Sequence, residues 1–209
     1  MSKEIYSVIK QRILSGEYAS GEIIKEKNLA EELDVSRTPI RENLARLEWE
    51  KLVTIIPRAG AMVAPIELNL VKEAYQVRFV LDGYLGRLAI ARITREQIQE
   101  LEALKAQCEG YVNEGTQEDL NNISNKVRAV LGKAANNKTL FELSEMLFNI
   151  TLRVWYSITE DDEHSELANA LISEIDALIK ACKDKDANAA EKAMQDAVVY
   201  YTEKLKKTF

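Results

Sequence analysis

The sequence has little of the chemistry on which metal sites and many enzymes depend. Its 209 residues include one histidine, His164, and two cysteines, Cys108 and Cys182. Two thiols cannot form a disulfide framework or a four-thiolate metal site, and a single histidine excludes a multi-histidine site within one chain. There is no phosphate-binding glycine loop and no nucleophile motif, so an enzyme is not expected.

Proline and glycine are also scarce, with three and eight residues, whereas alanine, leucine, glutamate and lysine are abundant. This composition favours a mostly helical protein. No window approaches the roughly 18 consecutive apolar residues that a membrane-spanning helix needs, so no membrane partner is expected. The N-terminus lacks the apolar core of an export signal, which predicts a cytoplasmic protein with reduced thiols.

The net charge of −6 is unevenly distributed along the chain. Residues 1–66 hold ten basic and ten acidic side chains, so the whole negative excess lies in residues 67–209. This distribution argues against indiscriminate binding of polyanions. A nucleic-acid surface, if the chain has one, should be local and should lie near the start.

Strand character is confined to the neighbourhood of Pro57 and Pro65. The β-branched run 53–56, the turn residues 57–60 and the apolar residues 61–63 predict a small hairpin. Apolar residues recur at helical spacing on both sides of it. The predicted helices are 3–15, 26–33 and 36–50 before the hairpin, then 69–92, 94–113, 117–135, 138–158, 164–184 and 186–207.

These elements predict a mostly α fold with two domains. The expected domains are a winged helix-turn-helix with a β-hairpin wing at 1–66 and an all-α six-helix bundle at 67–209. Six consecutive amphipathic helices can bury their apolar stripes only against one another.

Residues 29–44, LAEELDVSRTPIRENL, have the form of a helix, a tight turn and a second helix. The hydroxyl of Ser36 is expected to cap the second helix, and Pro39 fits its first turn. Ile40 and Leu44 lie on the buried side of that helix, which turns Thr38 and Arg41 outward. Guanidinium groups and a hydroxyl at an exposed helix N-terminus suit guanine edges and phosphates, although arginines on a packing helix can also simply face solvent.

The same residues closely resemble the GntR family of bacterial transcription regulators. The resemblance extends from about residue 5 to residue 63 and includes ILSGEYASGEII at 13–24. It implies that a dimer of winged helices reads double-stranded operator DNA. The DNA-binding positions expected from the resemblance and from the wing are Lys27, Ser36, Arg37, Thr38, Arg41, Arg46, Arg58 and Gly60.

The second half resembles, more loosely, the FCD-type ligand-binding domain of the FadR-like subgroup. Val77-Arg78 followed by Leu81-Asp82 looks like the opening of that domain, and residues 134–140 look like its central asparagine motif. In the metal-binding members an aspartate and three histidines hold a divalent ion. The corresponding positions here fall on Ser124, Arg128, Ile175 and Ala197. These side chains are not the expected ligands, so no metal and no other cofactor is expected.

Arg128 would instead place a guanidinium near the position of the family's metal. It could hold a carboxylate effector directly, or it could pair with an internal acid such as Asp82. The candidate effector-binding residues are Arg78, Ser124, Arg128, Asn149 and Arg153.

The sequence therefore predicts a DNA-binding transcription regulator that acts as a homodimer and responds to a small carboxylate without a metal. Two alternatives stay open for the helical domain. It could be a dimerisation scaffold that binds no ligand, or it could respond to an acyl-CoA.

Overall fold

The computed structural model describes residues 2–158 and 163–208. The chain divides into two compact units, each of which is described by itself. The first comprises the chain up to Val71 together with Asn149–Ser157, and the second comprises Lys72–Phe148 and Ile158–Phe209.

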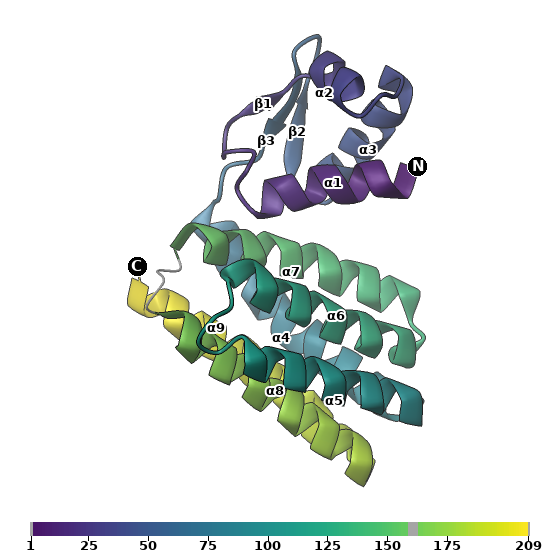
Figure 1. Ribbon diagram of the computed structural model, residues 1–209, viewed down its shortest axis with the longest axis vertical. Helices are drawn as coiled ribbons and strands as arrows, with labels where there is room; N and C mark the ends of the chain where they lie inside the picture. The colour runs from purple at the N-terminus through teal and green to yellow at the C-terminus, as the bar shows by residue number, and fades with distance from the viewer. Residues whose placement is uncertain (1, 159–162, 209) are drawn as a thin grey trace. The chain divides into compact units, whose positions relative to one another are not determined.

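The first unit begins with three helices and a short strand (Figure 1). These elements are α1 (Ser2–Leu14), β1 (Ile23–Ile24), α2 (Glu26–Glu32) and α3 (Arg37–Trp49). Their apolar side chains form a common core, in which Ile9, Ile40 and Leu47 have no exposed surface. Burial of large aliphatic side chains contributes about 1.5–3 kcal/mol each, which fixes the position of α3 against α1.

The wing is a three-stranded antiparallel sheet in the order β1-β3-β2. The predicted hairpin is confirmed as β2 (Val53–Ile56) and β3 (Gly60–Val63), paired from Val53 with Val63 to Ile56 with Gly60. The sequence did not predict β1, which pairs with β3 through Ile23 and Ile24. A segment of two residues shows no alternation of its own, so only the pairing identifies it as a strand.

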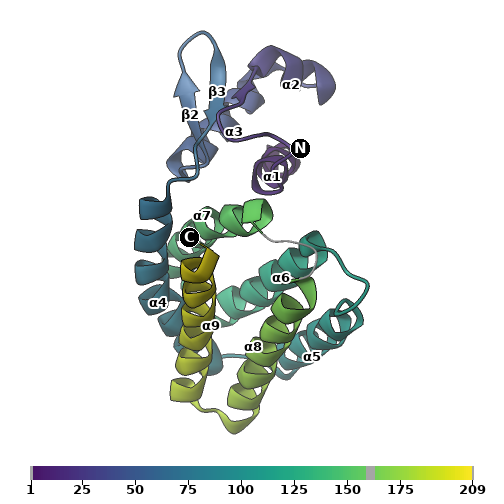
Figure 2. The same ribbon diagram turned by 90° about the vertical axis from the view of Figure 1, so that its left-hand side faces the viewer.

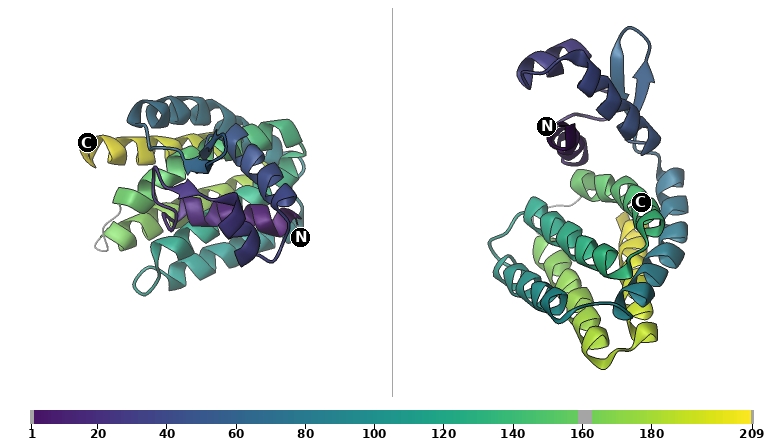
Figure 3. Two further views of the ribbon diagram at one scale, coloured as in Figure 1. Left: turned by 90° about the horizontal axis from the view of Figure 1, so that it is seen from above. Right: turned by 90° about the vertical axis from the view of Figure 1, so that its right-hand side faces the viewer.

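The remaining elements are the helices α4 (Leu68–Ile90), α5 (Arg95–Gly110), α6 (Gln117–Ala135), α7 (Lys138–Ile158), α8 (His164–Asp184) and α9 (Ala187–Thr208). They include every helix predicted after the hairpin, with ends within three residues of those expected. Figures 2 and 3 show the helices of the second unit packed along one another, with α4 and α5 at opposite edges. The core of this unit includes Leu85, Leu101, Leu131, Ile175 and Leu178, all fully buried.

The two cysteines and the one histidine of the chain all lie in the helical part, where they pack against or bond to neighbouring residues. Cys108 and Cys182 are buried and free, and burial raises the pKa of each thiol to about 11. The half-buried His164 begins α8, and its Nε2 lies 2.7 Å from the carbonyl oxygen of Tyr111. Over the described parts of the chain, no helix is long and apolar enough to cross a bilayer.

Candidate nucleic-acid interface

The tight turn between α2 and α3 sets the position of the second helix. Asp34 adopts a left-handed conformation with φ of 51°, and the N–H of Val35 donates to the carbonyl of Ala30. Ser36 occupies the N-cap position in an extended conformation, but its hydroxyl makes no capping hydrogen bond. The predicted Ser36 cap is therefore wrong. Pro39 occupies the third helical position and has no N–H, which removes one of the two donors that such a cap uses.

Helix α3 separates its apolar side from its basic side as predicted. Ile40, Leu44 and Leu47 are buried, whereas Arg37, Thr38 and Arg41 are exposed. The Nε of Arg41 donates to the Glu26 carboxylate at 2.7 Å, yet 65% of the Arg41 side chain remains exposed. The N-terminal half of α3 therefore presents two guanidinium groups and a hydroxyl to solvent.

A hollow of about 430 Å³ lies between the start of α2, the exposed side of α3 and the tip of the wing. Basic side chains dominate its lining, and Glu26 is the only acid among its lining residues. The hollow is lined by Ile23, Lys25, Glu26, Lys27, Arg37, Arg41, Arg58, Ala59 and Gly60. The structure thus brings five of the predicted DNA-binding residues together from three elements. Lys25 was not predicted; its position next to the charged start of α2 was the only available signal.

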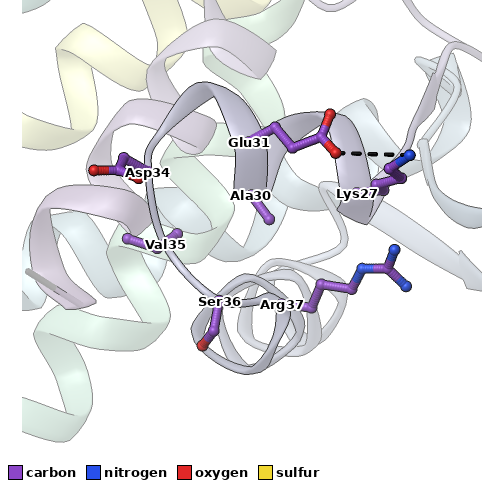
Figure 4. A pocket seen from close by; sticks show the side chains of 7 residues that line it. All are labelled: Lys27, Ala30, Glu31, Asp34, Val35, Ser36 and Arg37. Atoms are coloured by element: carbon purple, nitrogen blue, oxygen red, sulfur yellow. Dashed lines mark ion pairs between the residues drawn. The ribbon is translucent and has the colours of Figure 1, made fainter.

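A second hollow, of about 420 Å³, lies on the neighbouring side of the helix-turn-helix. Figure 4 shows its lining, in which the cationic ends of Lys27 and Arg37 extend toward the same side. Lys27 forms an ion pair with Glu31 at 3.6 Å, and both side chains are about two-thirds exposed. Ser36 lines this hollow as well. Lys27 and Arg37 line both hollows and so connect them, but the second hollow also contains Glu31 and Asp34, so the basic strip is the first hollow, formed by α3, the start of α2 and the wing.

Arg46, which lines neither hollow, and Gly60, which lines the first, both have structural roles in the first unit. The guanidinium of Arg46 lies over the Tyr6 ring at 3.7 Å and pairs with Glu50 at 3.3 Å. Gly60 has φ of 134°, and a Cβ at this position would lie 2.2 Å from the carbonyl oxygen of Ile24. Only glycine lets the wing approach β1 this closely.

The residues predicted to bind an effector do not share one environment. Arg128 is buried and donates to both carboxylate oxygens of Asp82, to Glu145 and to the Ser144 hydroxyl. Arg78 is also buried and pairs with Asp82 at 2.9 Å. Burial opposes ionisation of Asp82, but Arg128 and Arg78 outweigh it and hold its pKa below the ordinary value. The internal ion pair, which the sequence left open as an alternative, is the arrangement that the structure contains.

Ser124, Asn149 and Arg153 differ from this pair of arginines. Ser124 is half-buried on α6. Asn149 is buried, and no partner of its side-chain nitrogen lies within the described residues. Arg153 donates to the Ala64 carbonyl at 2.6 Å inside the first unit, and burial lowers its pKa. The described residues contain no cluster of three or more histidine, cysteine or acidic side chains placed to hold a metal ion.

Comparison with known protein families shows to which family the chain belongs. The family model of bacterial regulatory proteins of the gntR family matches residues 1–63, and that of the FCD domain matches residues 73–199. The chain belongs to the GntR family and carries an FCD domain. It is a DNA-binding transcription regulator and not an enzyme, and its winged helix-turn-helix is the DNA-binding part.

Individual relatives agree with this assignment. The chain is 26% identical over 189 residues to the HTH-type transcriptional regulator YdhC of Bacillus subtilis, covering 90% of this GntR protein and 83% of that one. It is 37% identical over 101 residues to the gluconate operon transcriptional repressor of Bacillus licheniformis, covering 46% and 41%. The solved structure of Escherichia coli McbR/YncC shares the fold, with a TM-score of 0.85, 22% identity and coverage of 99% and 97%.

Proposed function

We propose that the basic strip formed by α3, the start of α2 and the wing binds operator DNA sequence-specifically. Arg37, Thr38 and Arg41 would enter the major groove, where a guanidinium bonds to two acceptors of guanine. Lys25, Lys27 and Arg58 would neutralise phosphates on both sides of the groove. The observation that carries this proposal is the hollow itself, whose cations come from three separate elements and face one space.

The pairing of Arg41 with Glu26 bears on how DNA enters the hollow. Glu26 is the only acid in the lining, and its carboxylate accepts from Arg41. An exposed ion pair of this kind contributes only about 0–1 kcal/mol, so DNA can displace Glu26 at small cost. Glu26 thus holds the Arg41 guanidinium in place between binding events and repels phosphate from this point of the strip.

The proposal is tested by fluorescence anisotropy with duplexes taken from the DNA upstream of the gene. Arg37→Ala and Arg41→Ala should each weaken binding by roughly tenfold to a hundredfold, because one bidentate base contact contributes about 1–3 kcal/mol of discrimination. Lys27→Ala should weaken binding equally to all sequences. It should also make the fall of affinity with rising salt concentration less steep, by the amount that about one phosphate contact contributes. Lys138→Ala is the matched control, since Lys138 is 87% exposed on α7 of the helical part. Unchanged affinity in both arginine variants would exclude α3 as the reading helix.

We also propose that the protein acts as a homodimer that contacts two half-sites and that a small carboxylate bound in the FCD domain, without a metal, alters the fit. Four hydrogen bonds to internal partners already occupy Arg128. A carboxylate could therefore reach Arg128 only by displacing Glu145, whose side chain is 24% exposed, in contrast to the fully buried Asp82.

A thermal-shift screen of monocarboxylates and dicarboxylates tests this competition. Glu145→Gln removes the competing charge and should increase the shift that a true effector produces. Glu142→Gln, at an exposed position of the same helix, is the control. Identical shifts in wild type and Glu145→Gln, or no shift with any carboxylate, would remove Arg128 as the binding residue.

A further inference from the structure

The residue at which the wing ends is hydrogen-bonded through both of its backbone polar groups. Ala64 directly follows β3 and precedes Pro65, after which the chain continues into α4. Its N–H donates to the carbonyl oxygen of Leu52 at 3.0 Å. Its own carbonyl oxygen accepts from the guanidinium of Arg153 at 2.6 Å and from the hydroxyl of Ser20 at 3.4 Å. Ala64 is therefore the point at which the wing is fixed to the rest of the first unit.

Arg153 reaches this point from a distant part of the sequence. It lies on α7, 89 residues after Ala64, in the segment Asn149–Ser157 that belongs to the first unit. It is the only charged residue of that segment. The one charge that α7 brings into the first unit is thus used to bond the backbone at the end of the wing.

Arg153 is a costly residue for this position. Its exposed fraction is only 7%, and among the described residues no carboxylate pairs with it. Burial lowers its pKa, and no acid opposes this effect. The buried Arg128, in contrast, has Asp82 and Glu145 as partners. A buried guanidinium without a counter-charge destabilises a fold, so an apolar side chain of similar length would suit the packing better. Stability therefore does not explain Arg153, and its bond to the wing points to a role in what the wing does.

The wing carries the orientation of its base to its tip. Strands β2 and β3 are paired along their whole length, so the hairpin moves as one piece. Arg58 and Gly60, at the tip, line the basic hollow. The four-residue step from Gly60 to Ala64 corresponds to about 13 Å of strand, so a rotation of about 10° at Ala64 would displace the tip by about 2 Å. A displacement of this size breaks a hydrogen bond between Arg58 and a phosphate.

We propose that Arg153 is a positioning residue for DNA binding, which fixes the orientation of the wing through the Ala64 carbonyl and thereby places Arg58 against the DNA backbone. Arg153 itself does not touch the DNA. The inference rests on the proposed binding of operator DNA by the basic strip. It adds a determinant from the part of the chain that the FCD model matches, residues 73–199.

The first experiment separates this role from an ordinary structural one in the full-length protein. Arg153→Met removes the donor and the charge but keeps the length of the side chain. Operator affinity, measured by fluorescence anisotropy, should fall about fivefold, the effect of losing one hydrogen-bonded contact. The unfolding temperature should stay at or above that of wild type, because the burial cost of the charge is lost as well. Arg153→Lys keeps a cationic donor and should keep most of the affinity.

Lys138→Met, at an exposed position of the same helix, is the control and should change neither property. Unchanged affinity in Arg153→Met would overturn the inference. A lower unfolding temperature in Arg153→Met would also overturn it, since Arg153 would then be a structural residue of the first unit.

The second experiment tests whether Arg153 acts through the wing. In the wild-type background Arg58→Ala should weaken DNA binding and reduce the slope of affinity against salt concentration by about one phosphate contact. In the Arg153→Met background Arg58 is already displaced, so the same change should have little further effect on either quantity. Arg41→Ala alters α3 instead and should have the same effect in both backgrounds. Equal effects of Arg58→Ala in both backgrounds would overturn the inference.

The same measurements distinguish failure of the inference from failure of the proposed function. If Arg41→Ala loses affinity and Arg58→Ala does not, α3 reads the DNA without the wing, and the inference is wrong. If Arg58→Ala and Arg153→Met lose affinity while Arg37→Ala and Arg41→Ala do not, the proposed reading helix is wrong and the inference stands.

Discussion

Arg128 and Asp82 form a buried two-bond ion pair across 46 residues of the chain, with nitrogen–oxygen distances of 3.1 Å and 3.3 Å. Asp82 has no exposed surface, and Arg78 contributes a second cation on its other side. One carboxylate therefore balances two buried guanidinium groups, with help from Glu145 for Arg128. Because the charges are enclosed, the cluster contributes to stability only while all of its members are present.

Removal of the Asp82 charge should consequently destabilise the FCD domain strongly. Asp82→Asn preserves the side-chain volume but removes the carboxylate charge that faces both Arg78 and Arg128. We expect a loss of about 3–5 kcal/mol in the free energy of unfolding, measured by urea denaturation. Glu142→Gln, which breaks an exposed pair with Lys138, should cost less than about 1 kcal/mol. A loss below 1 kcal/mol in Asp82→Asn would mean that the cluster is solvated.

Glu174 should give the stability a distinct pH dependence. Part of its side chain reaches the surface, but its carboxyl is enclosed, and burial raises its pKa to about 7 although Arg128 and Arg78 lower it. Between pH 4.5 and 7 the folded protein keeps a proton that the unfolded chain has lost. The contribution of Glu174 to stability is therefore full below pH 4.5 and declines as the pH rises to 7.

Glu174→Gln removes this titration and isolates it from that of Asp82 and the other acids. From pH 4.5 to pH 7.5 the stability of the variant should increase relative to wild type by about 3 kcal/mol. Urea denaturation at several pH values measures the difference. Parallel pH profiles for variant and wild type would show that Glu174 titrates normally.

The local features of this fold were predictable from the sequence, and the long-range ones were not. The signals for a helix, its apolar period and the residues that end it, are contained in a short stretch of sequence, and so are those for a hairpin. The predicted helices and the hairpin therefore agree with the observed elements. The failure of the Ser36 cap has a local cause that the sequence contained, since Pro39 removes a donor. Strand β1 depends on pairing with β3, which no window around Ile23 reveals.

The same distinction applies to the sites. The exposed position of Arg37 and Arg41 follows from the helix period of their own segment. The partner of Arg128 lies on another helix, so the sequence could name Asp82 only as one possibility. The intramolecular contacts of Arg46 with Tyr6, 40 residues earlier, were not foreseen for the same reason.

Arg46 and Arg37 should therefore behave differently when each is replaced by alanine. Arg46 stacks on Tyr6 and pairs with the buried Glu50, to which the Tyr6 hydroxyl also donates at 2.6 Å. Arg46→Ala should lower the free energy of unfolding by about 1 kcal/mol. Arg37 has no ion-pair partner within the described residues, so Arg37→Ala should change stability by less than about 0.5 kcal/mol. Chemical denaturation measures the free energy of unfolding of both variants. Equal losses of stability would show that the contacts of Arg46 contribute no more than an exposed arginine does.

Gly60 should be required for the wing before any contact with DNA is considered. Its φ of 134° disfavours every other residue, and a Cβ there would overlap the Ile24 carbonyl oxygen at 2.2 Å. Gly60→Ala must therefore separate β3 from β1, and we expect a loss of about 2–4 kcal/mol in the free energy of unfolding. Gly21→Ala is the matched control, because Gly21 also has a positive φ, 83°, but no atom within 4 Å of the added Cβ. It should lose only about 1 kcal/mol, the cost of the backbone conformation alone.

Thermal unfolding and DNA affinity, measured on both variants, separate a role in the wing from a role in DNA binding. If Gly60→Ala were as stable as Gly21→Ala and bound DNA poorly, the glycine would act at the DNA surface instead of in the wing.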